Sequence, residues 1–270
     1  MSLGQLHESL LLSTHRSDGI SCLTLNDPAR RNSLSEAMLA ALGAAFDAAS
    51  SKPDVRVIIL SAAGRVFCAG HDLKEMTAGR LNSDRGRAYF TKILDQCSSV
   101  MQKIVACPKP VIAEIDGVAT AAGCQLVASC DLAVASKAAQ FCTPGVHIGL
   151  FCSTPMVALS RNLASKHTME MLLTGDMVPA SRAAEIGLVN QVVSSAKLRA
   201  TSMALAGKIA AKSSLTVATG KRAFYQQKEM DLAAAYNYAS EIMVDNMLAR
   251  DAEEGIAAFV EKRAPDWHDE

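Results

Sequence analysis

Two glycine-bearing turns hold the residues with the greatest potential for chemistry. The first, residues 67–76 (FCAGHDLKEM), follows an apolar β-branched run, and the second, residues 116–125 (DGVATAAGCQ), leads into an apolar helical stretch. A strand that ends in small residues and opens a helix leaves backbone N–H groups unpaired and directed outwards. Together with the positive end of the helix dipole, such donors form a site for an anionic oxygen.

Either turn alone is more often an ordinary tight turn, in which glycine permits unusual backbone angles. Neither turn matches a Walker A loop or a complete G-x-G-x-x-G motif, so the sequence does not predict a nucleotide site of those kinds. The two turns together, in this order, make an oxyanion-binding site the more interesting hypothesis.

The elements that must position these turns alternate between strands and helices in the first half of the chain. Continuous apolar runs predict strands at residues 19–26, 55–60, 109–113 and 131–135. The pattern Ser33–Leu–Ser–Glu36 is typical of a capping box and predicts a helix through Phe46. Residues 77–87 are polar and rich in arginine, which indicates a mobile loop before a helix at 88–106.

The second half of the chain is almost wholly helical in pattern. Short helices are predicted at 169–173 and 181–186, and amphipathic helices at 196–212, 215–227, 232–248 and 251–262. The prediction is an α/β protein with a core domain at residues 1–195 and a C-terminal helical region at 196–270.

Composition excludes several functional classes. Lys plus Arg and Asp plus Glu number 27 each, so no basic excess exists for a nucleic acid or a membrane surface, and we expect neither as a partner. The eight cysteines include no C-x-x-C pair, and we expect reduced thiols, no metal site and a cytoplasmic location. A mitochondrial matrix protein whose transit peptide has been removed is the alternative.

The ordered motifs resemble the crotonase (enoyl-CoA hydratase/isomerase) superfamily from about residue 12 to residue 265. Seven segments carry the resemblance, at residues 25–34, 67–73, 110–117, 122–131, 172–176, 183–189 and 259–263. It implies a spiral of ββα units with a C-terminal helical trimerisation region. The expected assembly is a homotrimer or a dimer of trimers, and the expected ligand is an acyl-CoA thioester, with no cofactor beyond the coenzyme A of the substrate.

The resemblance also implies site residues. The backbone N–H groups of His71 and Ala122 are expected to form an oxyanion hole for the thioester oxygen, in which one donor contributes about 3–4 kcal/mol to lowering the barrier. For each single lysine or arginine expected at CoA, a solvated surface charge is an explanation at least as good. The residues expected at the substrate and its CoA are Arg30, Arg31, Ala69, Gly70, Asp72, Leu73, Lys74, Gly123 and Lys262.

The sequence departs from its relatives at both acid/base positions. Relatives that hydrate enoyl-CoA use two glutamates, which map to Gln125 and Gly145 here. Glutamine cannot exchange a proton near neutral pH, and glycine has no side chain. If residues 145–148 are extended, His147 shares a face with Gly145 and is a candidate substitute, although a structural histidine is more frequent. Cys142, Cys152 and Ser153 are further candidates by proximity in sequence.

Three functions stay open at this point. An enoyl-CoA hydratase/isomerase-type enzyme with altered acid/base groups is the first. Decarboxylation of a malonyl-type acyl-CoA, in which loss of CO2 itself generates the enolate, is the second. A non-catalytic acyl-CoA-binding protein is the third.

Overall fold

Two β-sheets form the scaffold of the computed structural model, which describes residues 9–270. The large sheet has the order β1-β2-β3-β5-β7-β10, with strands at Leu11–His15, Ile20–Leu25, Val57–Ala62, Val111–Ile115, Leu132–Ser136 and Gln191–Val193. The small sheet has the order β4-β6-β8-β9, with strands at Val66–Cys68, Val118–Thr120, Gln140–Cys142 and Val178–Pro179. In both sheets the central neighbours are parallel, and only the β1–β2 and β8–β9 pairs are antiparallel.

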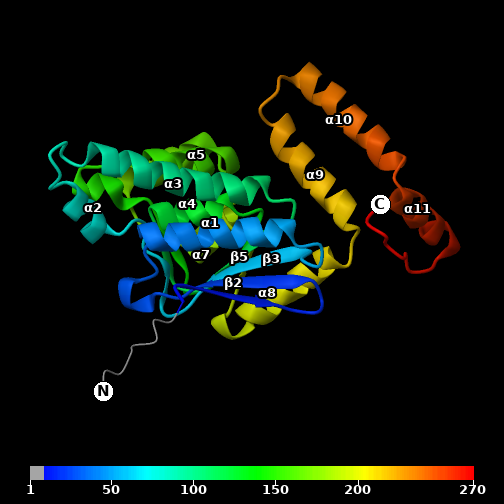
Figure 1. Ribbon diagram of the computed structural model, residues 1–270, viewed down its shortest axis with the longest axis horizontal. Coiled ribbons are helices and arrows are strands. Elements are labelled where there is room, and N and C mark those ends of the chain that lie inside the picture. The colour runs from blue at the N-terminus through cyan, green and yellow to red at the C-terminus, as the bar shows by residue number, and fades with distance from the viewer. Residues whose placement is uncertain (1–8) are drawn as a thin grey trace.

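The chain winds between the two sheets in repeated ββα units. Each of β3, β5 and β7 lies in the large sheet, and the next strand along the chain lies in the small one. Helices then return the chain, so the predicted spiral of ββα units is confirmed (Figure 1). The parallel β4–β6–β8 arrangement brings the ends of successive strands to one side, where the two glycine-bearing turns begin.

Helices cover both faces of the large sheet (Figure 1). On one face lie α1 (Glu36–Ser51), α3 (Arg87–Ala106) and α4 (Ala122–Ser129), with α5 (Ser153–Asn162) packed on α4. On the other face packs α8 (Ser195–Ala210). Along β3, Val57 and Ile59 belong to the core under α8, whereas Ile58 and Leu60 belong to the larger core. The prediction that this strand is buried on both faces is therefore confirmed.

The predicted helices are present, with two local corrections. The N-cap of α1 is Ser35, whose hydroxyl accepts the Met38 amide, so the predicted capping box from Ser33 is wrong. The predicted loop at 77–87 begins as helix, because α2 spans Leu73–Gly79. Gly175 and Gly187 have positive φ after α6 (Ser165–Thr174) and α7 (Ala180–Glu185), as expected of glycines that end helices.

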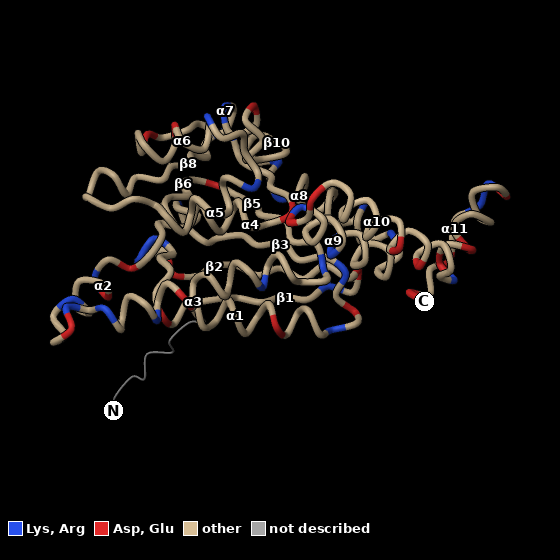
Figure 2. The backbone as a smooth tube through the Cα atoms, turned by 90° about the horizontal axis from the view of Figure 1, so that it is seen from above, with Lys and Arg blue, Asp and Glu red and all other residues tan. Residues whose placement is uncertain are grey.

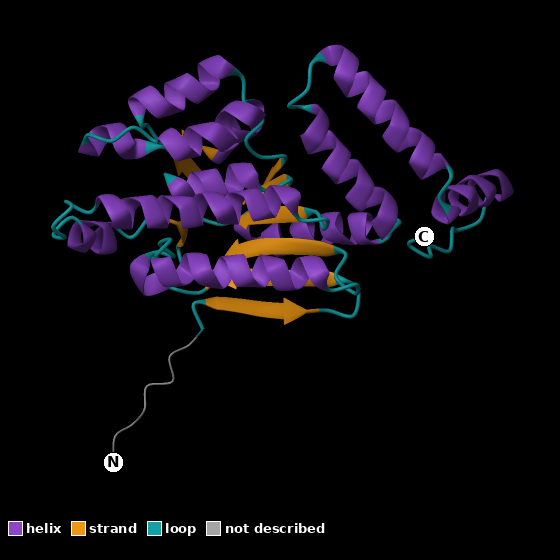
Figure 3. Ribbon diagram, turned by 45° about the horizontal axis from the view of Figure 1, so that its top comes forward, coloured by secondary structure: helices purple, strands orange, loops and turns teal. Residues whose placement is uncertain are grey.

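Three further helices extend from one end of the body (Figures 1 and 3). They are α9 at Ser214–Gln227, α10 at Leu232–Met247 and α11 at Arg250–Glu261, and every residue of α9 and α10 keeps at least part of its surface exposed. No helix among residues 9–270 combines the length and the apolar character that crossing a membrane requires. The boundary predicted at residues 195/196 stays a prediction, and the packing of α8 on the sheet joins that helix to the core.

Polar anchors attach α9 to the body. The Lys221 ammonium contacts Asp131 at 2.6 Å and donates to the carbonyls of Ile104 and Lys109, while Tyr225 donates to Asp131 at 2.9 Å. Because Lys221 and Asp131 are largely buried and fully hydrogen-bonded, Asp131 has a structural role here.

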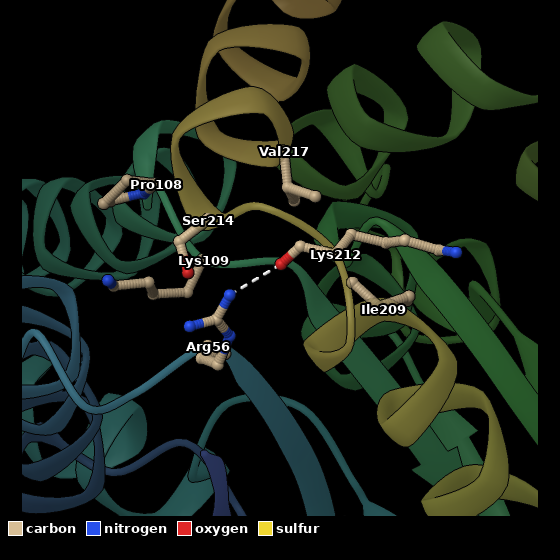
Figure 4. A pocket seen from close by; sticks show the side chains of 7 residues that line it. All are labelled: Arg56, Pro108, Lys109, Ile209, Lys212, Ser214 and Val217. Carbon is tan, nitrogen blue, oxygen red and sulfur yellow. Dashed lines mark hydrogen bonds between the residues drawn. The ribbon is translucent and has the colours of Figure 1, made fainter. Parts of the chain in front are cut away.

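Arg56 provides a second anchor, at the connection between α8 and α9. Its guanidinium donates to the carbonyls of Ala210 at 2.7 Å and Lys212 at 2.6 Å, beside a cavity of about 10 Å³ (Figure 4). The same group contacts the Asp269 carboxylate at 3.1 Å, so the C-terminal segment returns to the body.

Candidate functional site

The two glycine-bearing turns meet at the end of the small sheet. The Thr120 hydroxyl donates to the Ala69 carbonyl at 3.0 Å, which joins the turns directly. A Cβ built on Gly70 would lie 3.2 Å from the Ala122 amide nitrogen. A Cβ on Gly123 would lie only 2.3 Å from the Cys68 carbonyl oxygen, so this position accepts no side chain. Close backbone approach is therefore the reason for glycine at 70 and 123.

Two backbone amides point into this junction. Gly70 accepts from the Leu34 amide at 2.8 Å, and because the carbonyl and the N–H of one trans peptide point to opposite sides, the His71 amide points away from Leu34. Ala122 is the first residue of α4, so its amide has no partner inside the helix. Within residues 9–270 neither amide donates to an acceptor. Two adjacent free donors suit an oxygen that gains negative charge during a reaction.

Asn32 supports the first turn, and sequence reasoning assigned it no role. It is fully buried with φ of 51°, and its amide donates to the carbonyls of Ala63 and Val66 at 2.9 and 2.8 Å. Its oxygen accepts the Asp27 amide at 2.8 Å, and the neighbouring Arg31 carbonyl accepts the Ala69 amide. The available signal was an asparagine after a Pro-containing turn, because asparagine tolerates left-handed backbone. Thr120, the other missed residue, carries no comparable signal.

The residues whose side chains were expected at CoA near the first turn divide into two groups. Asp72 caps α2 by accepting the amides of Lys74 and Glu75, and Arg30 is paired with Asp27 at 2.6 Å. Their contacts are therefore structural. Arg31, Leu73 and Lys74 are exposed next to the first turn.

From α2 to the first residue of α3, the acidic residues Glu75 and Asp84 are interspersed with Lys74, Arg80, Arg85 and Arg87. Both colours accordingly appear around α2 in Figure 2. Lys262, the C-cap of α11, lies at the opposite end of the molecule, so one chain does not bring it to this site (Figures 1 and 2).

The condition under which His147 would share a face with Gly145, an extended backbone at 145–148, is not met. Pro144 begins a 3-10 turn, Pro144–Ile148, because its fixed φ favours the first helical position. His147 is consequently exposed, and its Nε2 lies 2.8 Å from the Thr174 carbonyl oxygen at the end of α6. This contact gives His147 a structural role in place of the acid/base role considered from the sequence.

Gly145 faces a sulfur atom. A Cβ at this position would lie 2.9 Å from both the Cys152 Sγ and the Leu150 carbonyl oxygen. Ser153 is exposed, and its hydroxyl donates to Phe151, so of the nearby candidates the thiols are the ones turned inward. A glutamate at 145 therefore does not fit the loop as it stands.

Two polar side chains at the junction lack partners. Gln125 is 4% exposed, and its Oε1 has no hydrogen bond within residues 9–270. Both ring nitrogens of His71 are likewise buried without a partner. Burial lowers the pKa of the His71 imidazole, and the nearby Leu34 backbone offsets this lowering only in part, so the ring is neutral at pH 7.

The carboxylates near the second turn are engaged elsewhere. Glu114 pairs with Arg199 at 3.5 Å, and Asp116 accepts the Ser195 hydroxyl at 3.2 Å. Within residues 9–270 no group of three or more His, Cys, Asp or Glu side chains has the geometry of a metal site.

Comparison with known proteins identifies relatives over nearly the whole chain. The profile of the enoyl-CoA hydratase/isomerase family matches residues 15–270. Enoyl-CoA hydratase domain-containing protein 3, mitochondrial, from Rattus norvegicus is 48% identical over 98% of this chain and 86% of its own length. The 2,3-dehydroadipyl-CoA hydratase of Escherichia coli is 31% identical over 95% of this chain and 98% of its own length.

Solved structures of related proteins also match nearly the whole chain. An enoyl-CoA hydratase from Mycobacterium smegmatis is 50% identical with a TM-score of 0.92, covering 97% of this chain and 100% of that one. Human enoyl-Coenzyme A hydratase domain-containing protein 3 is 47% identical with a TM-score of 0.90, and the match covers 96% of this chain and 100% of the human chain.

Ala121 generates a prediction about stability. Its φ of 50° and ψ of −119° lie in a region that suits glycine and strains alanine by about 1–3 kcal/mol. Glycine's larger backbone entropy offsets part of the relief, so we expect Ala121→Gly to raise the unfolding free energy by about 1 kcal/mol in urea titrations. The matched control is Ala122→Gly, whose helical backbone gains nothing from glycine. Equal or lower stability of Ala121→Gly would contradict the strain.

His71 generates a prediction about pH. Because its pKa is lowered on folding, the unfolded chain binds the proton more readily than the folded one. The stability contributed by the neutral ring is complete above the unfolded pKa of about 6.5 and is lost as pH falls below it. We expect the unfolding free energy to fall between pH 7 and pH 5 less steeply in His71→Gln than in the unmodified protein. An equal slope in His71→Gln and the unmodified protein would contradict the buried neutral ring.

Proposed function

The chain belongs to the enoyl-CoA hydratase/isomerase (crotonase) family, and from this premise we propose that it binds an acyl-CoA thioester and stabilises its enolate. The observation that carries the proposal is the pair of free amides, at His71 and Ala122, held together by the Thr120–Ala69 hydrogen bond. The thioester oxygen would accept both N–H groups and bind most tightly when it carries the enolate charge. The exposed Arg31 and Lys74 beside the first turn are the residues proposed to meet the CoA phosphates.

The absence of a protein acid and base at positions 125 and 145 limits which reactions of a CoA thioester the proposed site can catalyse. Positioned acids and bases each contribute about 10²–10⁴-fold in rate, and Gln125 and Gly145 supply neither. The proposed function is therefore enolate chemistry that requires no protein carboxylate. Ordinary hydration of an enoyl-CoA is expected to be weak.

Decarboxylation of a malonyl-type acyl-CoA is a second candidate, supported by one specific observation. The space in front of Gly145 contains the uncharged Cys152 thiol, and Glu114 and Asp116 are engaged elsewhere. A substrate carboxylate would meet no negative side chain there. Removal of this carboxylate from water, without repulsion that would prevent it from binding, favours the loss of CO2. A non-catalytic acyl-CoA-binding protein would share the binding but show no turnover.

We also propose that the C-terminal helices assemble the protein into a homotrimer or a dimer of trimers. Large apolar side chains on α10 and α11 are exposed, and a cavity of about 520 Å³ lies among α9, α10 and α11. A second subunit that covers these helices would also bring Lys262 toward a neighbouring site, which a single chain does not do.

The compartment is part of the proposal. The rat relative is mitochondrial by name, so the comparisons do not support the cytoplasmic location predicted from the sequence. The mitochondrial matrix, the alternative left open by the sequence, is the location that we propose.

The oxyanion hole is tested with acetoacetyl-CoA, which ionises to an enolate with its own near-ultraviolet absorbance. We expect the bound thioester to ionise at least one pH unit below the free one, equivalent to about 1.4 kcal/mol. Ala122→Pro removes one donor at a helix position that accepts proline, and should cancel most of this shift, whereas Ala122→Ser should retain it. Binding without any enolate signal in the unmodified protein would contradict the hole.

The missing carboxylates are tested by crotonyl-CoA hydration. We expect a rate at least a hundredfold below that of a two-glutamate relative. Gln125→Glu with Gly145→Glu, combined with Cys152→Gly to remove the contact with Sγ, should gain at least tenfold, about 1.4 kcal/mol, if the loop also moves the Leu150 carbonyl oxygen away from residue 145. Acyl-CoA affinity within a few-fold and an intact melting transition are the controls. A family-like hydration rate in the unmodified protein would show the interpretation to be wrong.

Assembly is tested by light scattering. We expect a mass of three or six times 28.5 kDa. Val244→Asp with Met247→Asp places charge on the exposed apolar surface of α10 and should shift the mass toward that of a monomer. Asn237→Asp, a charge added at an exposed polar position of the same helix, is the matched control. A monomeric unmodified protein at micromolar concentration would end this proposal.

A further inference from the structure

Three thiols gather beside the first turn of α4. Cys124 lies two residues after Ala122, Cys142 ends β8, and Cys152 precedes α5. Burial raises the pKa of the Cys124 thiol, and Coulombic interaction with Cys142 and Cys152 raises it further. The Cys142 carbonyl also accepts the Ala121 amide at 2.9 Å. The cluster is therefore tied to the turn that supplies the Ala122 amide.

Cys152 is the member of the cluster that faces Gly145. The Leu150 amide donates to the Gly145 carbonyl at 2.9 Å, which folds the loop back on itself. This fold places Sγ 2.9 Å from the position of a Cβ on Gly145. Because residue 145 has no side chain, the sulfur lies where a side chain at this position would begin.

We propose that Cys152 is a further catalytic residue, whose neutral thiol donates the proton that converts the bound enolate into product. This inference rests on the proposed function, in its decarboxylation form. The substrate class is a CoA thioester of a malonic half-acid, bound with its thioester oxygen at the His71 and Ala122 amides.

The step balances without an oxidant or a cofactor. The bond from Cα to the carboxylate breaks, its electron pair moves into the enolate, and CO2 leaves. The S–H bond of Cys152 then breaks, the proton bonds to Cα, and the resulting thiolate regains a proton from water. No atom changes oxidation state except the two carbons of the bond that is broken.

The environment of Cys152 suits this direction of transfer. Burial raises the pKa of its thiol, with the Gly145 backbone offsetting part of the rise, so the group is protonated at neutral pH. A thiol is a stronger acid than the Cα–H of a thioester, so protonation of the enolate is downhill. An uncharged donor also does not repel the substrate carboxylate as a glutamate would. Gln125, the other residue at a former acid/base position, cannot donate an acidic proton.

The test uses methylmalonyl-CoA in D2O, with mass spectrometry of the propionyl-CoA and analysis of the configuration at C2. The unmodified protein should place one deuterium at C2 in a single configuration. Cys152→Ala and Cys152→Ser should slow turnover at least tenfold or give mixed configuration, because the proton then comes from water. Cys142→Ala, a neighbouring thiol changed in the same way, should behave as the unmodified protein. The serine variant and melting curves separate a chemical effect from a folding defect.

Each contrary result has its own meaning. An unchanged rate and a single configuration in Cys152→Ala would overturn the role of Cys152 while leaving decarboxylation in place. Calorimetric binding of methylmalonyl-CoA without release of CO2 would overturn it together with the decarboxylation candidate, but not the acyl-CoA site. Absence of binding by any acyl-CoA would remove the proposed function itself.

Discussion

The close approach of two backbone segments, residues 68–71 and the start of α4, is the constraint on which the site depends. Gly123 lies so near the Cys68 carbonyl that any Cβ would collide with it, and Gly70 lies against Ala121 and Ala122. The Thr120–Ala69 hydrogen bond closes the contact. Parallel pairing of β4, β6 and β8 brings the two segments to the same end of the small sheet. Asn32 anchors the chain just before the first segment by donating to the carbonyls of Ala63 and Val66. The sheets thus position two amides rather than two side chains.

This junction holds features that lower stability. Ala121 has glycine-like backbone angles, and the buried polar atoms of His71 and Gln125 have no partners within residues 9–270. A buried unpaired polar group costs about 1–3 kcal/mol, and strained backbone costs a similar amount. Such costs persist where the surrounding structure over-determines the conformation, as it does here through Gly123, Thr120 and the Ala121–Cys142 hydrogen bond. Their concentration at one place supports a ligand site at this junction.

The sequence predicted the parts of the structure that depend on local pattern or on motif order. The strand at 55–60 was predictable because its apolar residues are continuous, whereas the two amides of the proposed oxyanion hole came from the resemblance to the family's motifs and stay a prediction. The turn at 144–148 was not predictable, because Pro144 starts a 3-10 helix whose continuation depends on Leu150 folding back to Gly145. Contacts across long separations were equally out of reach: the Lys221–Asp131 pair joins residues 90 positions apart. Cys152 was only a candidate by proximity until the fold placed its sulfur at Gly145.

The magnitudes decide which chemistry a carboxylate-free site can retain. Two amide donors at about 3 kcal/mol each preserve about 6 kcal/mol of stabilisation for an enolate. Hydration also needs a proton acceptor and a proton donor, and the loss of each removes about 10²–10⁴ in rate, or about 3–5 kcal/mol. Together the two losses, about 6–10 kcal/mol, equal or exceed what the amides provide for that reaction. Decarboxylation generates the enolate by breaking a carbon–carbon bond and needs only a later proton, so it retains the full contribution of the amides. We therefore propose that an amide side chain at 125 and a thiol beside residue 145, in place of two carboxylates, leave this fold a narrower range of reactions.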